Sequence, residues 1–169
     1  LRRVVSAGFT PRMLKRLEDS VQRIAGEIVD RVAEQGECDF VVDVAARLPL
    51  RIVCDLMGIP ESQHDLVFNR TNMILGASDP EYMPQDGDVL TGLLTAGGEL
   101  AALMGEVAES KRGGDGTDLT SMLVNAELDD DRLTHGDLAS FFNLLVVAGN
   151  ETTRNAIACT RIDLAENPA

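Results

Sequence analysis

The sequence predicts a mainly α-helical protein built around one long central helix. Apolar residues recur at intervals of three and four along much of the chain, which is the spacing of amphipathic helices. Residues that favour helix starts and ends, such as Thr10-Pro11, Gly36 and Thr134, stand at the boundaries of these periodic stretches. Aromatic residues make up only 4% of the chain, so the core must consist mainly of aliphatic side chains.

The first helix is predicted to begin at Thr10-Pro11 and to end at Gly36. Thr is a favoured N-cap, Pro suits the first helical position, and Gly is common just after a helix end. Apolar residues follow the helical spacing between these limits, at Leu14, Leu17, Val21, Ile24, Ala25, Ile28, Val29 and Val32.

The middle of the chain predicts shorter elements. Residues 38–42 are predicted to form a short edge strand. Residues 41–57 are predicted to form an apolar helix that Pro49 must start, kink or divide. The segment Gly58-Ile59-Pro60-Glu61 ends this helix and begins another, which reaches about Gly76.

A loop is expected at residues 77–87, because prolines and acidic residues concentrate there. Residues 89–111 are predicted to be helical, although four glycines interrupt them. Each glycine costs a helix roughly 1 kcal/mol relative to Ala, so this helix is expected to be mobile or closely approached by another element. A short helix is predicted over residues 118–126.

The longest predicted helix runs from Thr134 to about Glu166. Thr134 is a good N-cap with Asp137 three residues on, and Asn167-Pro168 ends the helix. At about 1.5 Å per residue it spans on the order of 48 Å, enough to cross the molecule. Residues 138–150 contain no charged side chain, so this stretch is expected to lie in the core.

The composition excludes several functions. The net charge of −13 argues against nucleic-acid binding, which requires a basic surface. There is no secretory signal and no apolar stretch of about 18 residues, so no membrane span is expected. The three cysteines form no close pair, which fits a reduced cytoplasmic location. Cys54 and Cys159 are predicted to be small core residues.

An acid and two alcohols, Glu151, Thr152 and Thr153, interrupt the apolar run of the long helix. A carboxylate there is costly unless it is paired, solvated or in use. Gly149 lets a flat or bulky group lie against the backbone, and the Thr152 hydroxyl can bond to the Ala148 carbonyl. One interpretation is a site where Glu151 relays protons through water. The other is that a buried helix re-emerges into solvent, and the spacing favours neither.

The segment Ala148-Gly149-Asn150-Glu151-Thr152-Thr153 resembles the oxygen-activation motif of the cytochrome P450s, the haem-thiolate monooxygenases, which reads Ala/Gly-Gly-x-Asp/Glu-Thr-Thr/Ser. Residues 1–12, 48–60 and 118–123 also resemble bacterial members of this family. The resemblance implies a helical core fragment of the P450 fold, whose long central helix, at about 134–166, carries the motif. Residues 1–169 would then form one partial domain, truncated at both ends.

The resemblance assigns roles residue by residue. Thr152 matches the threonine that organises water during oxygen activation, and Glu151 matches the neighbouring acid that delivers protons. Ala148 and Gly149 match the positions that lie against the distal face of the haem. Arg2 matches an arginine that pairs with a haem propionate.

Residues 144–157 and 71–82 are similar to actinobacterial-type enzymes that hydroxylate methyl-branched lipids and sterol side chains. An apolar substrate is therefore implied, with Val147, Ala148, Met73 and Leu75 as candidate substrate-binding residues. The family also implies haem b, O2 and electrons from a ferredoxin-type donor.

The chain lacks two features of the family. None of its cysteines lies in the Phe- and Gly-rich loop that supplies the haem ligand, and the Glu-x-x-Arg signature that precedes that loop in the family is absent together with the loop. No metal ligand is therefore assigned to this chain, and in isolation it is expected to be inactive. The alternative is a non-enzymatic helical ligand-binding or regulatory domain, which gives no reason for Gly149-x-Glu151-Thr152 in mid-helix.

Overall fold

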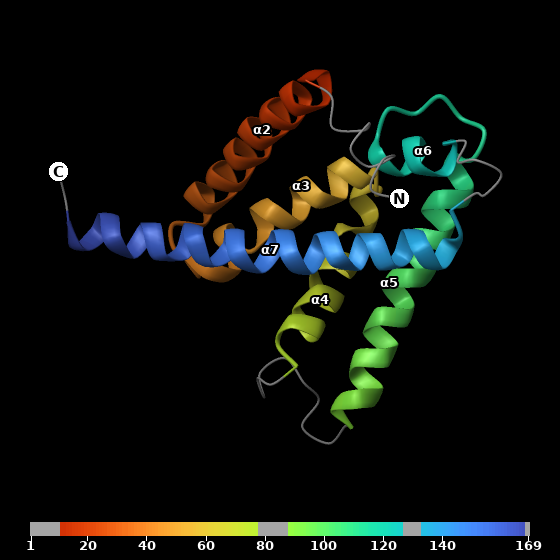
Figure 1. Cartoon of the computed structure of the whole chain (residues 1–169). Helices are drawn as coiled ribbons and strands as arrows, with labels where there is room; N and C mark the ends of the chain where they lie inside the picture. The colour runs from red at the N-terminus through yellow and green to blue at the C-terminus, as the bar shows by residue number, and fades with distance from the viewer. Residues whose placement is uncertain (1–10, 78–87, 127–132, 168–169) are drawn as a thin grey trace.

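A computed structural model describes residues 11–77, 88–126 and 133–167. These residues are mainly helical, as the sequence predicts, and they contain no strand. The long helix α7 crosses the whole molecule, with α2 and α3 on one side and α4 and α5 on the other (Figure 1). The helices are α2 (Pro11–Gln35), α3 (Arg47–Met57), α4 (His64–Leu75), α5 (Val89–Lys111), α6 (Leu119–Val124) and α7 (His135–Glu166), with a π-helical turn η1 (Phe40–Ala45) and a 3-10 turn η2 (Glu61–Gln63).

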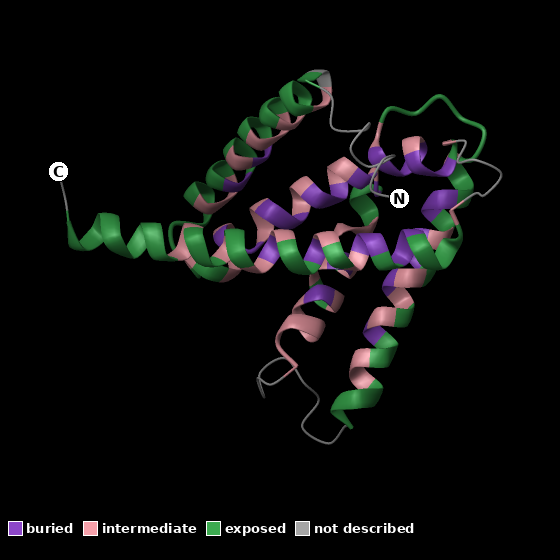
Figure 2. Ribbon diagram, viewed as in Figure 1, coloured by how far each residue is buried: buried purple, intermediate pink, exposed green. Residues whose placement is uncertain are grey.

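Helix α2 has the predicted limits. It begins at Pro11 and ends at Gln35, and Gly36 follows with a φ of 81°. Only part of its predicted apolar stripe is buried, since Ile24 is 0% exposed and Val29 is 59% exposed. Figure 2 shows this as a narrow buried stripe on an otherwise exposed helix. The reason is that α2 lies at the edge of the molecule and packs mainly against α3.

The prediction of a strand at residues 38–42 is wrong. Residues Phe40–Ala45 form the π-helical turn η1 instead. Asp39 Oδ1 accepts hydrogen bonds from the backbone N–H groups of Val41, at 2.9 Å, and Val42, at 3.1 Å. This N-cap satisfies the first amides of a helical turn, so the residues that suit a strand begin a helix.

The helix predicted for residues 41–57 is divided in two, as Pro49 requires. The division falls at Ala46, between η1 and α3. Pro49 lies in the first turn of α3, where the helix has no intrahelical acceptor for the missing N–H.

The glycine-rich helix predicted for residues 89–111 is confirmed as α5. A Cβ at Gly97 or Gly98 would meet nothing within 4 Å among the described residues, so close packing does not require glycine at these two positions. At Gly105 the nearest atom to such a Cβ is His135 Nδ1, at 4.0 Å. Of the two alternatives predicted for this helix, mobility or close approach by another element, the second is therefore not found at these three glycines.

Helix α7 begins as predicted with a reciprocal capping box. The Asp137 N–H donates to Thr134 Oγ1 at 3.2 Å, and the Thr134 N–H donates to Asp137 Oδ2 at 3.0 Å. The helix runs without interruption to Glu166.

The cysteine predictions are half right. Cys54 is buried in α3, and this burial raises the pKa of its thiol to about 12. Cys159 is exposed, so its predicted core position is wrong. The reason is that α7 leaves the core after Asn150, the last buried residue of the helix.

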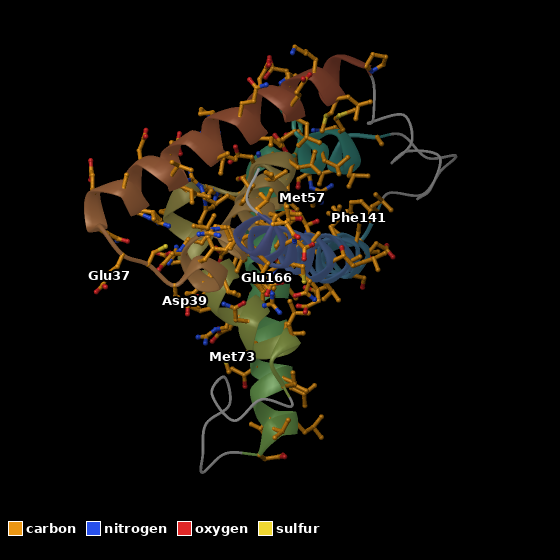
Figure 3. The ribbon with its side chains drawn as sticks, turned by 90° about the vertical axis from the view of Figure 1, so that its left-hand side faces the viewer. Glu37, Asp39, Met57, Met73, Phe141 and Glu166 are labelled. Carbon is orange, nitrogen blue, oxygen red and sulfur yellow. The ribbon has the colours of Figure 1, made fainter. Side chains whose placement is uncertain are left out.

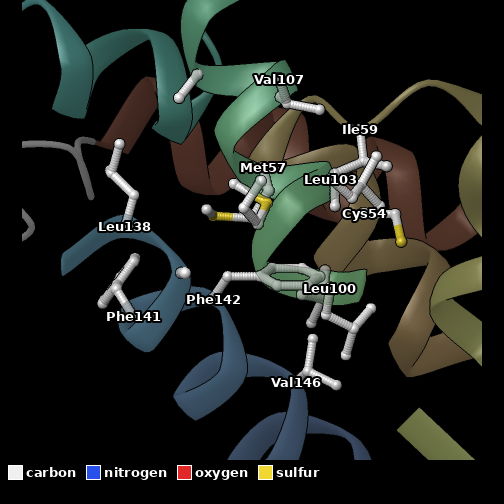
Figure 4. Packing of buried hydrophobic residues seen from close by; sticks show 14 of the residues in the cluster. Cys54, Met57, Ile59, Leu100, Leu103, Val107, Leu138, Phe141, Phe142 and Val146 are labelled. Atoms are coloured by element: carbon white, nitrogen blue, oxygen red, sulfur yellow. The ribbon is translucent and has the colours of Figure 1, made fainter. Parts of the chain in front are cut away.

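The core lies where α7 crosses α3 and α5. Phe142 of α7 is 0% exposed and packs in one cluster with Met57 of α3 and Leu100 of α5 (Figure 4). Val146, one turn further along α7, belongs to the same cluster. Burial of these side chains fixes the position and rotation of α7.

A polar junction joins the ends of α3, α5 and α6. Asp118 caps α6 by accepting from the Ser121 N–H at 3.0 Å, and it also accepts from Lys111 Nζ at 2.9 Å. Gly58 has a φ of 65°, and a Cβ there would lie 2.5 Å from Asp118 Cγ. The junction therefore requires glycine at this position.

In the part of the chain described here, no helix has both the length and the hydropathy needed to cross a bilayer.

Replacing Asp118 with Asn should destabilise the protein in a pH-dependent way. Burial raises the pKa of Asp118, but bonds from Lys111 and Ser121 outweigh that effect and hold the pKa below its ordinary value. The ionised carboxylate therefore stabilises the fold above its unfolded-state pKa, and this contribution disappears as pH falls through the lower folded-state pKa. Urea unfolding should show a loss of about 1–2 kcal/mol at neutral pH.

The same loss should shrink below pH of about 4, because Asp118 is then protonated in the unfolded chain. Asp115→Asn, an equal charge change at an exposed loop position, serves as the control and should leave stability unchanged. An equal loss for Asp118→Asn at neutral and acidic pH would contradict the assigned role of the charge.

Candidate functional site

The segment of α7 that carries the candidate motif has one buried face and one open face. Val146 and Asn150 are each 1% exposed, and they lie one turn apart on the buried face. Leu144, Ala148 and Thr152 follow the same four-residue spacing on another face, where all three are exposed. Together with Val147, which is also exposed, this row of α7 residues is named the open face. Figure 3, which looks along α7, shows the helix flanked by α2 on one side and by α4 and α5 on the other.

The Thr152 hydroxyl makes the predicted hydrogen bond. Its Oγ1 donates to the Ala148 carbonyl oxygen at 2.9 Å. The helix nevertheless continues unbroken through this point, so the bond does not open the backbone. The hydroxyl oxygen keeps its lone pairs for a donor on the open face, because it uses only its hydrogen in this bond.

Glu151 is paired within its own helix. Arg154 Nη2 lies 2.8 Å from Glu151 Oε1 and 2.7 Å from Oε2, and Asn155 Nδ2 donates to Oε1 at 3.1 Å. The Glu151 side chain is 37% exposed. The carboxylate thus combines a fixed cationic partner with access to solvent, so water can reach it.

Both interpretations of the acid therefore have support in the geometry. Within the described part of α7, no residue after Asn150 is buried, so the helix emerges from the core at Glu151. It emerges directly beside the open face with its Thr152 hydroxyl, which is where a proton relay would need an ionisable group.

Gly149 faces the protein and not the open face. A Cβ built on it would lie 3.8 Å from Val53 Cγ2 of α3, which is ordinary van der Waals contact. The small side chain that leaves space on the open face is therefore that of Ala148.

The other candidate residues are placed less closely together. Val147 is 40% exposed beside Ala148. Met73 and Leu75 are partly buried in the last turns of α4, and Figure 3 shows Met73 on that separate helix. Arg2 lies outside the described residues. The structure thus unites Val147, Ala148 and Thr152 on one helix and leaves the α4 pair on another.

Asn150 is a residue that the sequence did not single out. Its side chain is 1% exposed, and neither Oδ1 nor Nδ2 has a hydrogen-bond partner among the described residues. A buried amide without partners costs about 1–3 kcal/mol for each group, so this position calls for an ordered water. Its four-residue spacing from Val146 on the buried face was the signal that could have revealed it.

The described residues contain no group of three or more His, Cys, Asp or Glu side chains placed to hold a metal ion.

Comparison with known proteins identifies the family. No protein-family model matches the sequence. The chain is 42% identical over 171 residues to the methyl-branched lipid omega-hydroxylase of Mycobacterium tuberculosis, an alignment that covers 99% of the chain and 39% of that relative. It is 36% identical over 168 residues to the steroid C26-monooxygenase of Mycolicibacterium smegmatis, covering 99% of the chain and 38% of that relative.

Two solved structures that are similar in fold are of the same kind as these relatives. A Mycobacterium marinum cytochrome P450 in complex with pseudoionone superposes with a TM-score of 0.85 at 42% identity, over 94% of this chain and 38% of that one. This chain has the sequence and the fold of part of a cytochrome P450. A second P450, from Bacillus megaterium in complex with corticosterone, superposes with a TM-score of 0.82 at 27% identity, over 98% of this chain and 44% of that one.

The P450 resemblance inferred from the motif is therefore confirmed, and so is the helical P450 fold. The chain spans about two fifths of the length of the curated relatives it matches, 39% in the omega-hydroxylase.

Gly149→Ala should leave this P450 segment as stable as before or more stable by up to about 1 kcal/mol. The methyl group would replace a glycine in mid-helix and would lie at contact distance from Val53. Gly149→Leu should instead cost about 1–3 kcal/mol, because the larger side chain must displace Val53. Urea unfolding of both variants checks this, and a strong loss for Ala would contradict the contact described.

Proposed function

We propose that this chain is part of a bacterial haem-dependent monooxygenase that hydroxylates an apolar substrate. The observation that supports this most strongly is the Ala148-to-Thr153 motif on the central helix of a P450 fold, with Ala148 and Thr152 exposed. The relative at 42% identity, named a methyl-branched lipid omega-hydroxylase, supports an apolar lipid, sterol side chain or terpenoid as the substrate class.

The proposed cofactor is haem b, and the open face has the character that a flat macrocycle requires. Leu144 is 64% exposed and Val147 is 40% exposed, and Ala148, next to Val147, adds only a methyl group. When bound, the haem supplies the iron chemistry that activates O2 and inserts one oxygen atom into a C–H bond. Gly149 is also a proposed haem contact, through its backbone only, because a side chain there would face Val53. Arg2 is the proposed partner of a propionate.

The thiolate ligand is proposed to come from a part of the protein outside these 169 residues. Cys54 is unsuited to ligation because its burial raises its pKa to about 12, which keeps the thiol protonated. Cys38 and Cys159 are exposed, but neither lies in a Phe- and Gly-rich loop. For the same reason the isolated chain is proposed to be inactive.

Thr152 and Glu151 are the proposed catalytic residues. The Thr152 oxygen can accept a hydrogen bond from water on the open face, while the hydroxyl still donates its own hydrogen bond to the Ala148 carbonyl. Glu151 is partly exposed and oriented by Arg154, so it can take a proton from solvent and pass it to water near Thr152.

Substrate contacts are proposed for Val147 and Ala148 on the open face and for Met73 and Leu75 on α4. A largely apolar wall with few polar groups is typical of sites for greasy ligands. The electron donor is proposed to be a ferredoxin-type protein in the cytoplasm. The alternative, a non-enzymatic helical ligand-binding or regulatory domain, gives Thr152 and Glu151 no task.

Thr152→Ala in the complete enzyme should uncouple electron use from product formation. Without the hydroxyl, water on the open face loses its orientation, so electron consumption should continue while product falls and released peroxide rises. Positioned proton transfer contributes about 10²–10⁴-fold in rate, so product formation per electron consumed should fall clearly. Electron uptake, product and peroxide are measured in the same reaction.

Thr160→Ala is the matched control, because Thr160 Oγ1 makes the same bond, to the Ala156 carbonyl at 2.7 Å, two turns further along. It should leave coupling unchanged. Unchanged coupling in Thr152→Ala would refute the role given to Thr152.

Glu151→Gln should slow turnover by impairing proton delivery, because the amide keeps the shape but cannot exchange a proton at neutral pH. Turnover in H2O and D2O is compared, and the variant is expected to be slower with a larger solvent isotope effect. Asp163→Asn removes the same charge from an exposed position of α7 and is the control. Unaltered turnover and isotope effect in Glu151→Gln would exclude Glu151 from the relay.

A further inference from the structure

A cleft of about 160 Å³ opens between α2, α3 and the start of α4. Three arginines from two helices line it, Arg31 on α2 and Arg47 and Arg51 on α3, together with His64 at the start of α4. This concentration of positive charge is unexpected in a chain with a net charge of −13. The arginines of α3 lie on a different face from Val53, which packs towards α7, so the cleft is separate from the open face.

Among the described residues, Arg47 has one buried N–H donor, at Nε, that makes no hydrogen bond. Its guanidinium carbon lies 4.8 Å from the centre of the Phe68 ring, which holds the group in place by a cation–π contact. The side chain is 27% exposed, so the outer end of the guanidinium, and not the shielded Nε, is the part that an acceptor in the cleft can reach.

The carboxylates that line the cleft do not neutralise Arg47. Asp65 Oδ1 is 3.8 Å from Arg47 Nη1, and the Asp65 side chain is 88% exposed. Surface pairs of this kind contribute about 0–1 kcal/mol. Glu61, the other acid of the lining, is also exposed.

Arg31, Arg51 and His64, the other basic residues of the cleft, are each held in place by a hydrogen bond to the protein. Arg31 Nη2 donates to the Asp43 carbonyl at 3.0 Å, and Arg51 Nη2 pairs with Glu27 Oε2 at 2.6 Å. A guanidinium has five N–H donors, so each keeps several for a ligand. His64 Nε2 lies 3.1 Å from the Ile59 carbonyl, which only accepts, so this nitrogen carries the proton.

We propose that this cleft binds a small oxyanion, a carboxylate or phosphate group, with Arg47 as its main ligand. The planar guanidinium matches a carboxylate or phosphate with two parallel hydrogen bonds. Arg31 and Arg51 add charge from either helix, and Phe68 and Leu50 provide an apolar wall for the rest of a ligand. The proposal does not depend on the monooxygenase function, because the cleft uses none of its residues.

Calorimetric titration of the complete protein at low ionic strength tests this, with inorganic phosphate and propionate as separate probes and neutral propionamide as the blank. Saturable binding of phosphate or propionate, but not of propionamide, is expected. A stronger signal for propionate would identify an organic acid as the ligand type, and a stronger signal for phosphate would identify a phosphate group.

Variants locate the site. Arg47→Met keeps an apolar side chain over Phe68 and should weaken binding by about tenfold or more, as expected for lost hydrogen bonds to a charged group. Arg112→Gln removes the same charge from a surface arginine that pairs with Glu109, and it should leave affinity unchanged. Asp65→Asn removes the competing carboxylate and should tighten binding by about threefold, which a misfolded variant could not do.

The proposal is overturned by the absence of saturable binding in the unmodified protein. It is also overturned if Arg47→Met binds as tightly as the parent, or if Arg112→Gln weakens binding as much as Arg47→Met. Circular dichroism melting of each variant confirms that the fold is intact.

Discussion

Burial of one face of α7 against α3 and α5 is the interaction on which the rest of the structure depends. Phe142 and Val146 are 0% and 1% exposed, and they share one cluster with Met57, Leu100 and Leu103. Because side chains in such a cluster interlock at close-packed density, they fix the rotation of α7 about its own axis. That rotation decides which side chains of the motif point outward.

The outward face follows directly from this rotation. Four-residue steps carry Val146 to Asn150 on the buried side and Leu144 through Ala148 to Thr152 on the open side. The hydroxyl proposed for catalysis is therefore rigidly positioned by core packing two turns away, without any loop. Preorganisation of this kind is what catalytic groups require.

Several charged side chains on the helices are paired with groups of opposite charge. Glu151 is held by Arg154, and Asp118 is held by Lys111 at the junction of α5 and α6. Arg47 differs, since it has a buried donor without a partner and only a long contact to an exposed Asp65. Among the cationic groups of the described ranges, this imbalance is the reason for assigning the oxyanion cleft.

Local chemistry determined what could be predicted from the sequence. Thr134 with Asp137, and Pro11 with Gly36, mark helix limits through backbone hydrogen bonds and fixed φ angles, which depend on near neighbours alone. The Thr152-to-Ala148 bond was predictable for the same reason, because both groups lie on one helical turn.

Tertiary packing decided the features that the sequence did not predict. Residues 38–42 suit a strand but no neighbouring strand is described, so Asp39 caps a helical turn there instead. The exposure of Cys159, the direction in which Gly149 faces, the burial of Asn150 and the meeting of Arg31 with Arg47 all depend on which helices lie alongside. Those contacts join residues far apart in the chain, and no local pattern encodes them.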